Sequence, residues 1–105
     1  MDRIGSARML REELENRFGD RLRKVLVFGS TAKGCAREDS DIDVLVVVEG
    51  GEDWRVARAV RDAAMTVEIE TEAVFDLKTT SEKELTTIAG RTPFMEKVFA
   101  EGISI

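Results

Sequence analysis

The run of seven residues from Ile42 to Val48 constrains the fold of this chain more than any other feature. All of its residues except Asp43 are aliphatic and most are β-branched, a composition that favours an extended strand. Because no polar residue interrupts the run after Asp43, the strand must be covered on both faces. A shorter run of the same kind, from Val25 to Phe28, precedes it. The chain therefore needs covering layers on both sides of a buried sheet.

The segments around these strands have helical spacing. Apolar residues recur at intervals of three and four from Ile4 to Phe18, which predicts an amphipathic helix that ends at Gly19-Asp20. A second stripe predicts a helix with the Trp54 side chain in the core. The apolar positions of this second stripe are Trp54, Ala57, Val60 and Ala64.

The pattern changes from Met65 onward, where apolar and acidic residues alternate. We expect an extended segment there, with Glu68, Glu70 and Glu72 on its solvated face. A third strand is expected at residues 74–77, although the alternation leaves its start open.

Two further helices are expected after this strand. Ser81 and Glu84 have the spacing of a capping box, and Pro93 suits the first turn of a last short helix that Gly102 ends. Residues 103–105 are expected to add an edge strand. The order of elements predicts an α/β (α+β) fold, a small mixed β-sheet packed with helices in a single domain of residues 1–105.

The composition excludes several kinds of chemistry. The 105 residues include no histidine and one cysteine, Cys35, which excludes zinc sites and histidine-based triads. The net charge of −5 argues against stable nucleic-acid binding by the chain alone. No apolar run is long enough to span a membrane, the first residues lack a secretory signal, and a lone cysteine suits the cytosol. We therefore expect a cytoplasmic protein with no membrane contact.

Gly29-Ser30, at the end of the first strand, is a candidate phosphate-binding turn. Such a turn presents free backbone N–H groups and a hydroxyl to an anion, and Gly29 lets the anion approach the backbone. Gly34 allows a second tight turn. An ordinary strand-to-helix turn explains the same residues equally well when they are taken alone.

Asp41 and Asp43 are candidate metal ligands. Two residues apart on an extended segment, they point to the same face, where their charges repel each other unless a cation lies between them. Mg²⁺ prefers one or two carboxylates together with phosphate oxygens and water. The alternative is a turn in which Asp39, Ser40 and Asp41 cap backbone amides.

Taken together, these motifs resemble a known family. The pattern is Gly29-Ser30-x-Ala32-Lys33-Gly34, then Ser40-Asp41-x-Asp43-Val44, with Phe75-Asp76-Leu77 and the segment from Phe94 to Gly102 later in the chain. It resembles the minimal nucleotidyltransferases (MNT) of the DNA polymerase β-like superfamily, as found in HEPN/MNT toxin–antitoxin pairs. The resemblance covers nearly the whole chain and implies the polymerase β-like fold.

The resemblance also implies a set of site residues. It implies two Mg²⁺ ions, catalytic and metal-binding Asp41, Asp43 and Asp76, and nucleotide-binding Gly29, Ser30, Lys33 and Gly34. Glu68, Glu70 and Glu72 compete with Asp76 for the role of the third carboxylate. Lys33 departs from the arginine that relatives often carry, which weakens the expected triphosphate contact, and Arg37 is an alternative cation.

The resemblance implies transfer of a nucleoside monophosphate, as AMP from ATP, to an acceptor hydroxyl. We expect the acceptor to lie on a small helical HEPN-domain partner, as for an MNT-type antitoxin. The alternative is a catalytically inactive module that neutralises such a partner by contact. A small-molecule nucleotidyltransferase ranks third, because that class needs a second domain to hold its acceptor.

Overall fold

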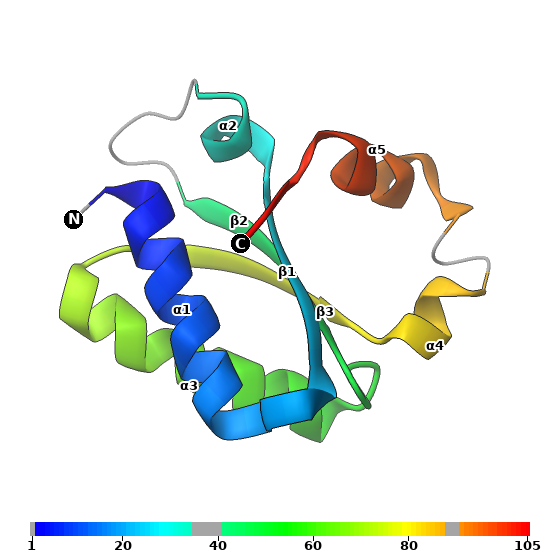
Figure 1. Cartoon of the computed structure of the whole chain (residues 1–105), viewed down its shortest axis with the longest axis horizontal. Helices are drawn as coiled ribbons and strands as arrows, with labels where there is room; N and C mark the ends of the chain where they lie inside the picture. Colours follow the sequence, from blue (N-terminus) through cyan, green and yellow to red (C-terminus); the bar gives the residue numbers. More distant parts are fainter. Residues whose placement is uncertain (1, 35–40, 88–90) are drawn as a thin grey trace.

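The computed structural model describes residues 2–34, 41–87 and 91–105 (Figure 1). Within these residues the strands form one four-stranded mixed sheet in the order β3-β2-β1-β4. β1 is antiparallel to both β2 and β4, whereas β2 and β3 are parallel. The strands are β1 (Leu22–Phe28), β2 (Ile42–Val48), β3 (Phe75–Thr80) and β4 (Ile103–Ser104).

Helices cover the sheet from both sides. α1 and α3 pack together on one face, whereas α4 and α5 lie on the other (Figure 1). Since α3 connects the parallel strands β2 and β3, the chain has the crossover that parallel pairing requires. The helices are α1 (Arg3–Phe18), a 3₁₀ turn (Gly19–Arg21), α2 (Gly29–Ala32), α3 (Trp54–Thr71), α4 (Glu82–Leu85) and α5 (Pro93–Glu101). The fold class predicted from the sequence is confirmed.

Alternate residues of the central strands enter two hydrophobic clusters. Val44 and Val46 face α1 and α3, where they pack with buried helix residues such as Leu10 and Val60. Leu45 faces the other way, into a smaller cluster with residues of β1, β2 and α5. This division confirms that the run after Asp43 is covered on both faces. It also means that Asp43, two residues before Leu45, points toward the α5 side of the sheet.

The expectation of an extended segment after Met65 is wrong, because α3 continues to Thr71. Buried Val60, Ala64 and Val67 keep helical spacing through this stretch, and their contact with the core decides its conformation. The apparent alternation arose from Ile69, which lies 78% exposed on the opposite side of the helix. Glu68, Glu70 and Glu72 thus lie on a helix and its C-cap, and they do not form a strand face.

The expectation that Trp54 lies in the core is also wrong. Trp54 is the first residue of α3 and is 68% exposed. It precedes Val60 by six residues, which is about 240° around a helix of 3.6 residues per turn, so it cannot share the buried stripe. Its ring instead packs against the guanidinium of Arg55, 5.6 Å from the ring centroid.

The predicted end of α1 and the predicted start of α5 agree with the structure. Gly19 follows α1 with a positive φ of 55°, and Pro93 is the first residue of α5. The Oγ of Ser81 accepts the Glu84 N–H at 3.0 Å, but the Glu84 carboxylate accepts from the Thr80 hydroxyl, so only half of the capping box forms. Residues 103–104 pair with β1 as the expected edge strand. None of the helices in the described ranges is long and apolar enough to cross a bilayer.

Glu68 has a structural role that its place in the sequence does not reveal. One carboxylate oxygen accepts the backbone N–H of Phe75 at 2.8 Å, and the other pairs with Arg61. The carboxylate therefore joins the last turns of α3 to the first residue of β3.

We predict that Glu68→Ala lowers the free energy of unfolding by about 1.5–3 kcal/mol, the scale for losing a charge-assisted hydrogen bond. Glu70→Ala, on the same helix but exposed, should change it by less than about 0.5 kcal/mol. Urea denaturation of both variants measures the difference. Equal effects would show that Glu68 does not join the two elements.

Candidate active site

Three segments of the chain meet at one end of the sheet. Because β1 and β2 are antiparallel, Phe28 at the end of β1 pairs with Asp43 near the start of β2. Because β2 and β3 are parallel, Asp43 also pairs directly with Asp76. The phosphate-turn candidate Gly29 and two of the predicted carboxylates are thus brought together by strand register.

Asp43 and Asp76 lie side by side on neighbouring strands, and their carboxyl groups interact electrostatically. Burial, the neighbouring Asp76 and, more weakly, Asp41 raise the pKa of Asp43 above its usual value, while Lys78 acts in the opposite direction. The Lys78 ammonium lies 3.7 Å from a carboxylate oxygen of Asp76. The site therefore concentrates negative charge that, among the described residues, exposed Lys78 only partly balances.

Gly29 is required by this arrangement. A Cβ built on Gly29 would lie 2.3 Å from the Oδ2 of Asp43, closer than atoms can approach. Its φ of +66° is also in the left-handed region that favours glycine. The backbone of the turn is thus held directly against the carboxylate of Asp43.

α2 begins at Gly29 and is anchored from α1. The Arg3 side chain donates to the Thr31 hydroxyl at 2.9 Å and to the carbonyl of Asp41 at 2.8 Å. Arg3 therefore ties the turn after β1 to the start of β2. Sequence reasoning missed this residue, since no pattern relates it to a motif that lies more than twenty-five residues later.

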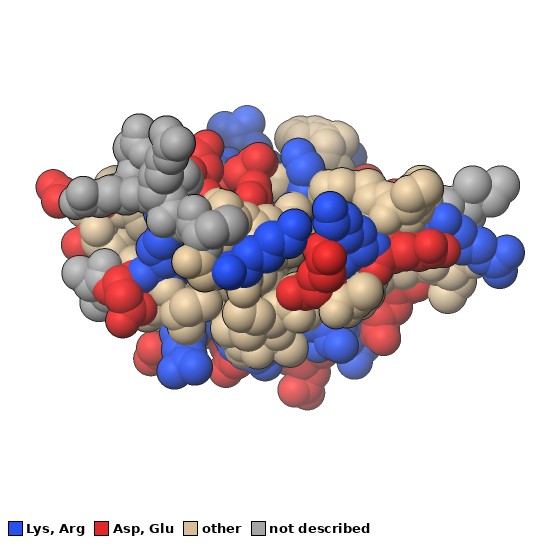
Figure 2. All heavy atoms as spheres, turned by 90° about the horizontal axis from the view of Figure 1, so that it is seen from above, with Lys and Arg blue, Asp and Glu red and all other residues tan. Residues whose placement is uncertain are grey.

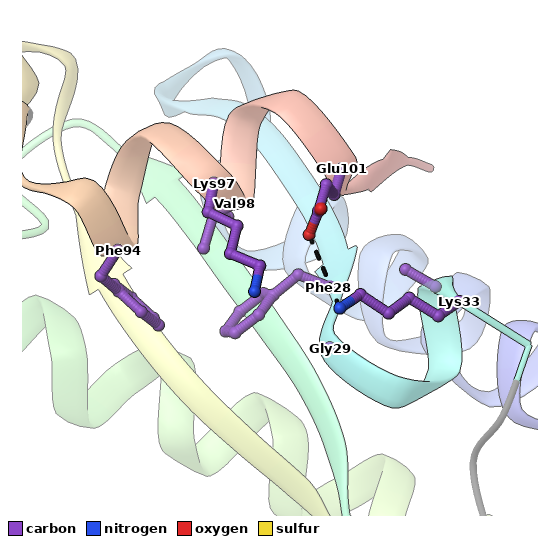
Figure 3. Close-up of a pocket in the computed structure, with 8 residues that line it drawn as sticks. Phe28, Gly29, Lys33, Phe94, Lys97, Val98 and Glu101 are labelled. Carbon is purple, nitrogen blue, oxygen red and sulfur yellow. Dashed lines mark ion pairs between the residues drawn. The ribbon is translucent and has the colours of Figure 1, made fainter.

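A cavity of about 230 Å³ opens between α2 and α5, next to Gly29 (Figure 3). The Phe28 and Phe94 rings meet edge to face in its wall, with their centroids 5.8 Å apart. Lys33 reaches from α2 toward Glu101 on α5, where Nζ lies 3.8 Å from a carboxylate oxygen. Lys97, also on α5, supplies a second ammonium group.

Sequence reasoning missed Lys97 and Phe94 as lining residues. The helical spacing of Phe94, Lys97 and Glu101 does place them on one face of α5. The sequence contains no signal, however, that this face lies opposite the turn at Gly29.

The remaining predicted residues lie as follows. Ser30 is within α2, and Gly34 follows it with a φ of +71°. Asp41 is exposed and directly precedes β2. Glu70 and Glu72 are exposed at the end of α3. Cys35, Arg37, Asp39 and Ser40 lie outside the described residues.

The donor set fits a hard divalent cation. Adjacent oxygens of Asp43 and Asp76 repel each other, and Mg²⁺ is commonly held by one or two carboxylates with substrate phosphates. In the residues that the structure describes, no three carboxylate or other metal-binding side chains are already gathered closely enough to enclose an ion. The protein thus offers two ligands at one point and leaves the remaining positions to other oxygens.

The surface around this end is of mixed charge. Figure 2 looks down on it and shows lysine and arginine side chains interspersed with aspartate and glutamate. The described residues on this face do not form a continuous basic patch of the kind that binds a nucleic-acid backbone.

Comparisons with known proteins relate this geometry to a family. The family model described as "Nucleotidyltransferase domain" matches residues 7–97. Protein adenylyltransferase MntA from Thermococcus cleftensis is 51% identical over 39 residues, which are 37% of this chain and 37% of that protein. The match thus spans little more than a third of that relative.

Two solved structures have a similar fold. A toxin–antitoxin crystallised with AMP-PNP aligns with a TM-score of 0.66 at 20% identity, over 93% of this chain and 70% of that chain. A protein from Sulfolobus solfataricus assigned as a nucleotidyltransferase aligns with a TM-score of 0.50 at 26% identity, over 96% of this chain and 83% of that chain.

The two glycines with positive φ in this region provide a matched test. Gly34→Ala should cost about 1–2 kcal/mol of stability, because only its backbone is strained and no described atom lies within 4 Å of the new methyl group. Gly29→Ala should cost at least about 1 kcal/mol more, since the methyl group must also displace Asp43. Denaturant unfolding measures both, and equal costs would contradict the close contact.

A second prediction concerns pH. The raised pKa of Asp43 means that its contribution to stability is fully present below its ordinary value of 3.8 and is lost as pH rises through the higher native value. Asp43→Asn removes the charge and can donate to Asp76, so the metal-free variant should melt at a higher temperature than wild type at pH 7. The difference should shrink toward pH 3. Asp20→Asn, an exposed control, should show no such gain, and a less stable Asp43→Asn at pH 7 would contradict the repulsion.

Proposed function

Since the chain belongs to the nucleotidyltransferase domain family, we propose that it transfers AMP from ATP to a hydroxyl group on a partner protein. The observation that carries the proposal is the adjacency of Asp43 and Asp76, held against the Gly29 turn by strand register. The adenylyltransferase named MntA, similar over part of its length, supports AMP as the group transferred and protein as the acceptor class.

The nucleotide would lie along the turn and the adjoining cavity. The first N–H groups of α2 have no partner within the helix, so they and the Ser30 hydroxyl are suited to hold phosphate oxygens. Lys33 and Lys97 line the neighbouring cavity and would balance triphosphate charge, with Gly34 allowing the chain to turn away. To bind phosphate, Lys33 must exchange its present partner, Glu101.

Asp41, Asp43 and Asp76 would hold Mg²⁺ in this site, two ions by the resemblance to the family. When bound, the metal supplies charge neutralisation at the phosphates and makes the acceptor oxygen more acidic. Asp43, the most enclosed of the three carboxylates, faces both neighbours, whereas Asp76 is exposed and accessible to an acceptor.

The transfer is a displacement at the α-phosphorus. The acceptor oxygen forms a bond to that phosphorus, and the bond from phosphorus to the bridging oxygen breaks. Pyrophosphate leaves with the electron pair, and the Asp76 carboxylate takes the hydroxyl proton. The turn at Gly29 and Ser30 orients the chain of phosphates so that the leaving group lies opposite the acceptor.

We propose a toxin as the partner, specifically a small helical HEPN-domain protein. The solved toxin–antitoxin structure with AMP-PNP shares the fold of this chain and supports a paired system. The mixed charge near the site also favours a protein acceptor over a nucleic acid, which would need a basic surface. A cytoplasmic location follows from such a partner.

Label transfer tests the proposal. With α-labelled ATP, Mg²⁺ and a purified HEPN-domain toxin, wild type should label the toxin. Asp76→Asn should reduce transfer on the order of 100-fold or more, since it removes a charge from the reacting centre. Glu70→Gln, an exposed carboxylate on α3, is the matched control and should leave the rate unchanged.

Two outcomes would contradict the proposal. Undiminished transfer by Asp76→Asn would remove that carboxylate from the reaction. Neutralisation of the partner by wild type without any label, at saturating ATP, would instead support an inactive module that acts by contact.

A further inference from the structure

The outer face of α3 carries an apolar stripe that the described residues do not cover. Trp54, Met65 and Ile69 are 68%, 51% and 78% exposed. Their spacings of eleven and four residues place them on one side of the helix, within about 60° of one another, with charged residues between Trp54 and Met65. This side is opposite the stripe of Val60 and Val67, which packs into the core.

The N-cap carboxylate of Asp53, which accepts the Arg55 N–H, complements the dipole of α3, but the charges within the end turns run against it. Its first turn has no acidic residue and its last turn no basic one. Instead, exposed Arg55 and Arg58 lie near the amino end, and exposed Glu70 and Glu72 lie near the carboxyl end. A helix is stabilised by the reverse arrangement, so these charges are unfavourable for the helix by itself.

Arg58 and Glu72 have no ion-pair partner among the residues that the structure describes. Arg58 lies on the same side of α3 as the exposed apolar residues, and Glu72 is the exposed C-cap that follows the last turn of the helix. Met65 is midway between them, seven residues from each. The outer face therefore has Arg58 near one end and Glu72 at the other, with Met65 and Ile69 between them beside the exposed carboxylate of Asp62.

We propose that this face binds a second copy of the chain, with the two α3 helices antiparallel about a two-fold axis near Met65. A two-fold axis at that point places Arg58 of each copy opposite Glu72 of the other. The same surface therefore supplies both partners of each ion pair. The antiparallel arrangement also sets the basic end of each helix beside the acidic end of its neighbour and opposes the two dipoles. Charge complementarity thus selects a second copy as the occupant.

The dimer would leave both candidate active sites open. α3 covers the face of the sheet occupied by Val44 and Val46, whereas Asp43 points toward the α5 side. Pairing through the outer face of α3 therefore does not obstruct the cavity between α2 and α5.

Light scattering after size exclusion tests the proposal on the full chain. At increasing concentration the mass should approach twice the 11.7 kDa of one chain. Met65→Asp and Ile69→Asp should raise the dissociation constant on the order of 10-fold or more, because each buries a carboxylate at the centre of the contact. Both residues are exposed in the single chain, so the melting temperature at low concentration should not fall.

A charge swap distinguishes a specific contact from nonspecific association. Arg58→Glu and Glu72→Arg should each weaken the dimer, and the double variant should restore it. Arg8→Glu, an exposed charge on α1, is the matched control and should not change the mass. A monomer at every concentration would overturn the proposal, as would a dimer indifferent to the α3 variants. A monomer whose α3 face is protected only when a different protein is added would overturn it equally.

Discussion

The in-register parallel pairing of β2 with β3 is the constraint on which the candidate site depends. It places Asp43 directly beside Asp76, although thirty-three residues of chain separate them. The pairing exists because α3 returns the chain to the same end of the sheet. A shift of one residue would turn Asp76 to the opposite face and bury it among apolar side chains. The same hydrophobic core that stabilises the fold therefore enforces a pair of repelling carboxylates.

The ion pairs around the candidate site are weak. Lys78 contacts Asp76 at 3.7 Å, and Lys33 contacts Glu101 at 3.8 Å, with all four side chains about half exposed. Ion pairs of this exposure contribute roughly 0–1 kcal/mol, so phosphate and metal ligands can replace them at little cost. Such a site is suited to a charged substrate, because its own contacts are easily exchanged.

The two faces of the sheet differ in the residues that cover them. The face under α1 and α3 contains most of the buried apolar residues. The α5 face has a smaller apolar cluster, which leaves room beside it for a cavity lined by lysines and aromatic rings. The inner side of α3 completes the larger core. Its outer side carries the exposed apolar and charged residues that we propose bind a second copy of the chain. The larger core and the candidate site therefore lie on opposite faces of the sheet.

Sequence alone determined the elements whose signals are local. The aliphatic run of β2, the turn at Gly29 and the helix starts at Ser81 and Pro93 each depend on a few neighbouring residues, and the structure has each where the sequence predicts it. The fold class followed from their order. Asp76 was singled out through the resemblance of its motif to a family, since composition and spacing left the glutamates of α3 as rivals.

Tertiary structure decided the features that depend on long-range contact. Alternation after Met65 suggested an extended segment, but burial of Val67 against the core made it helical. The sequence could not show that Arg3 would reach the backbone of Asp41 or that Lys97 would face the turn at Gly29, because both contacts join elements far apart in the chain. Periodicity reports which side of an element is apolar. What that side meets, and which carboxylates become neighbours, is determined only when the strands pair and the helices pack.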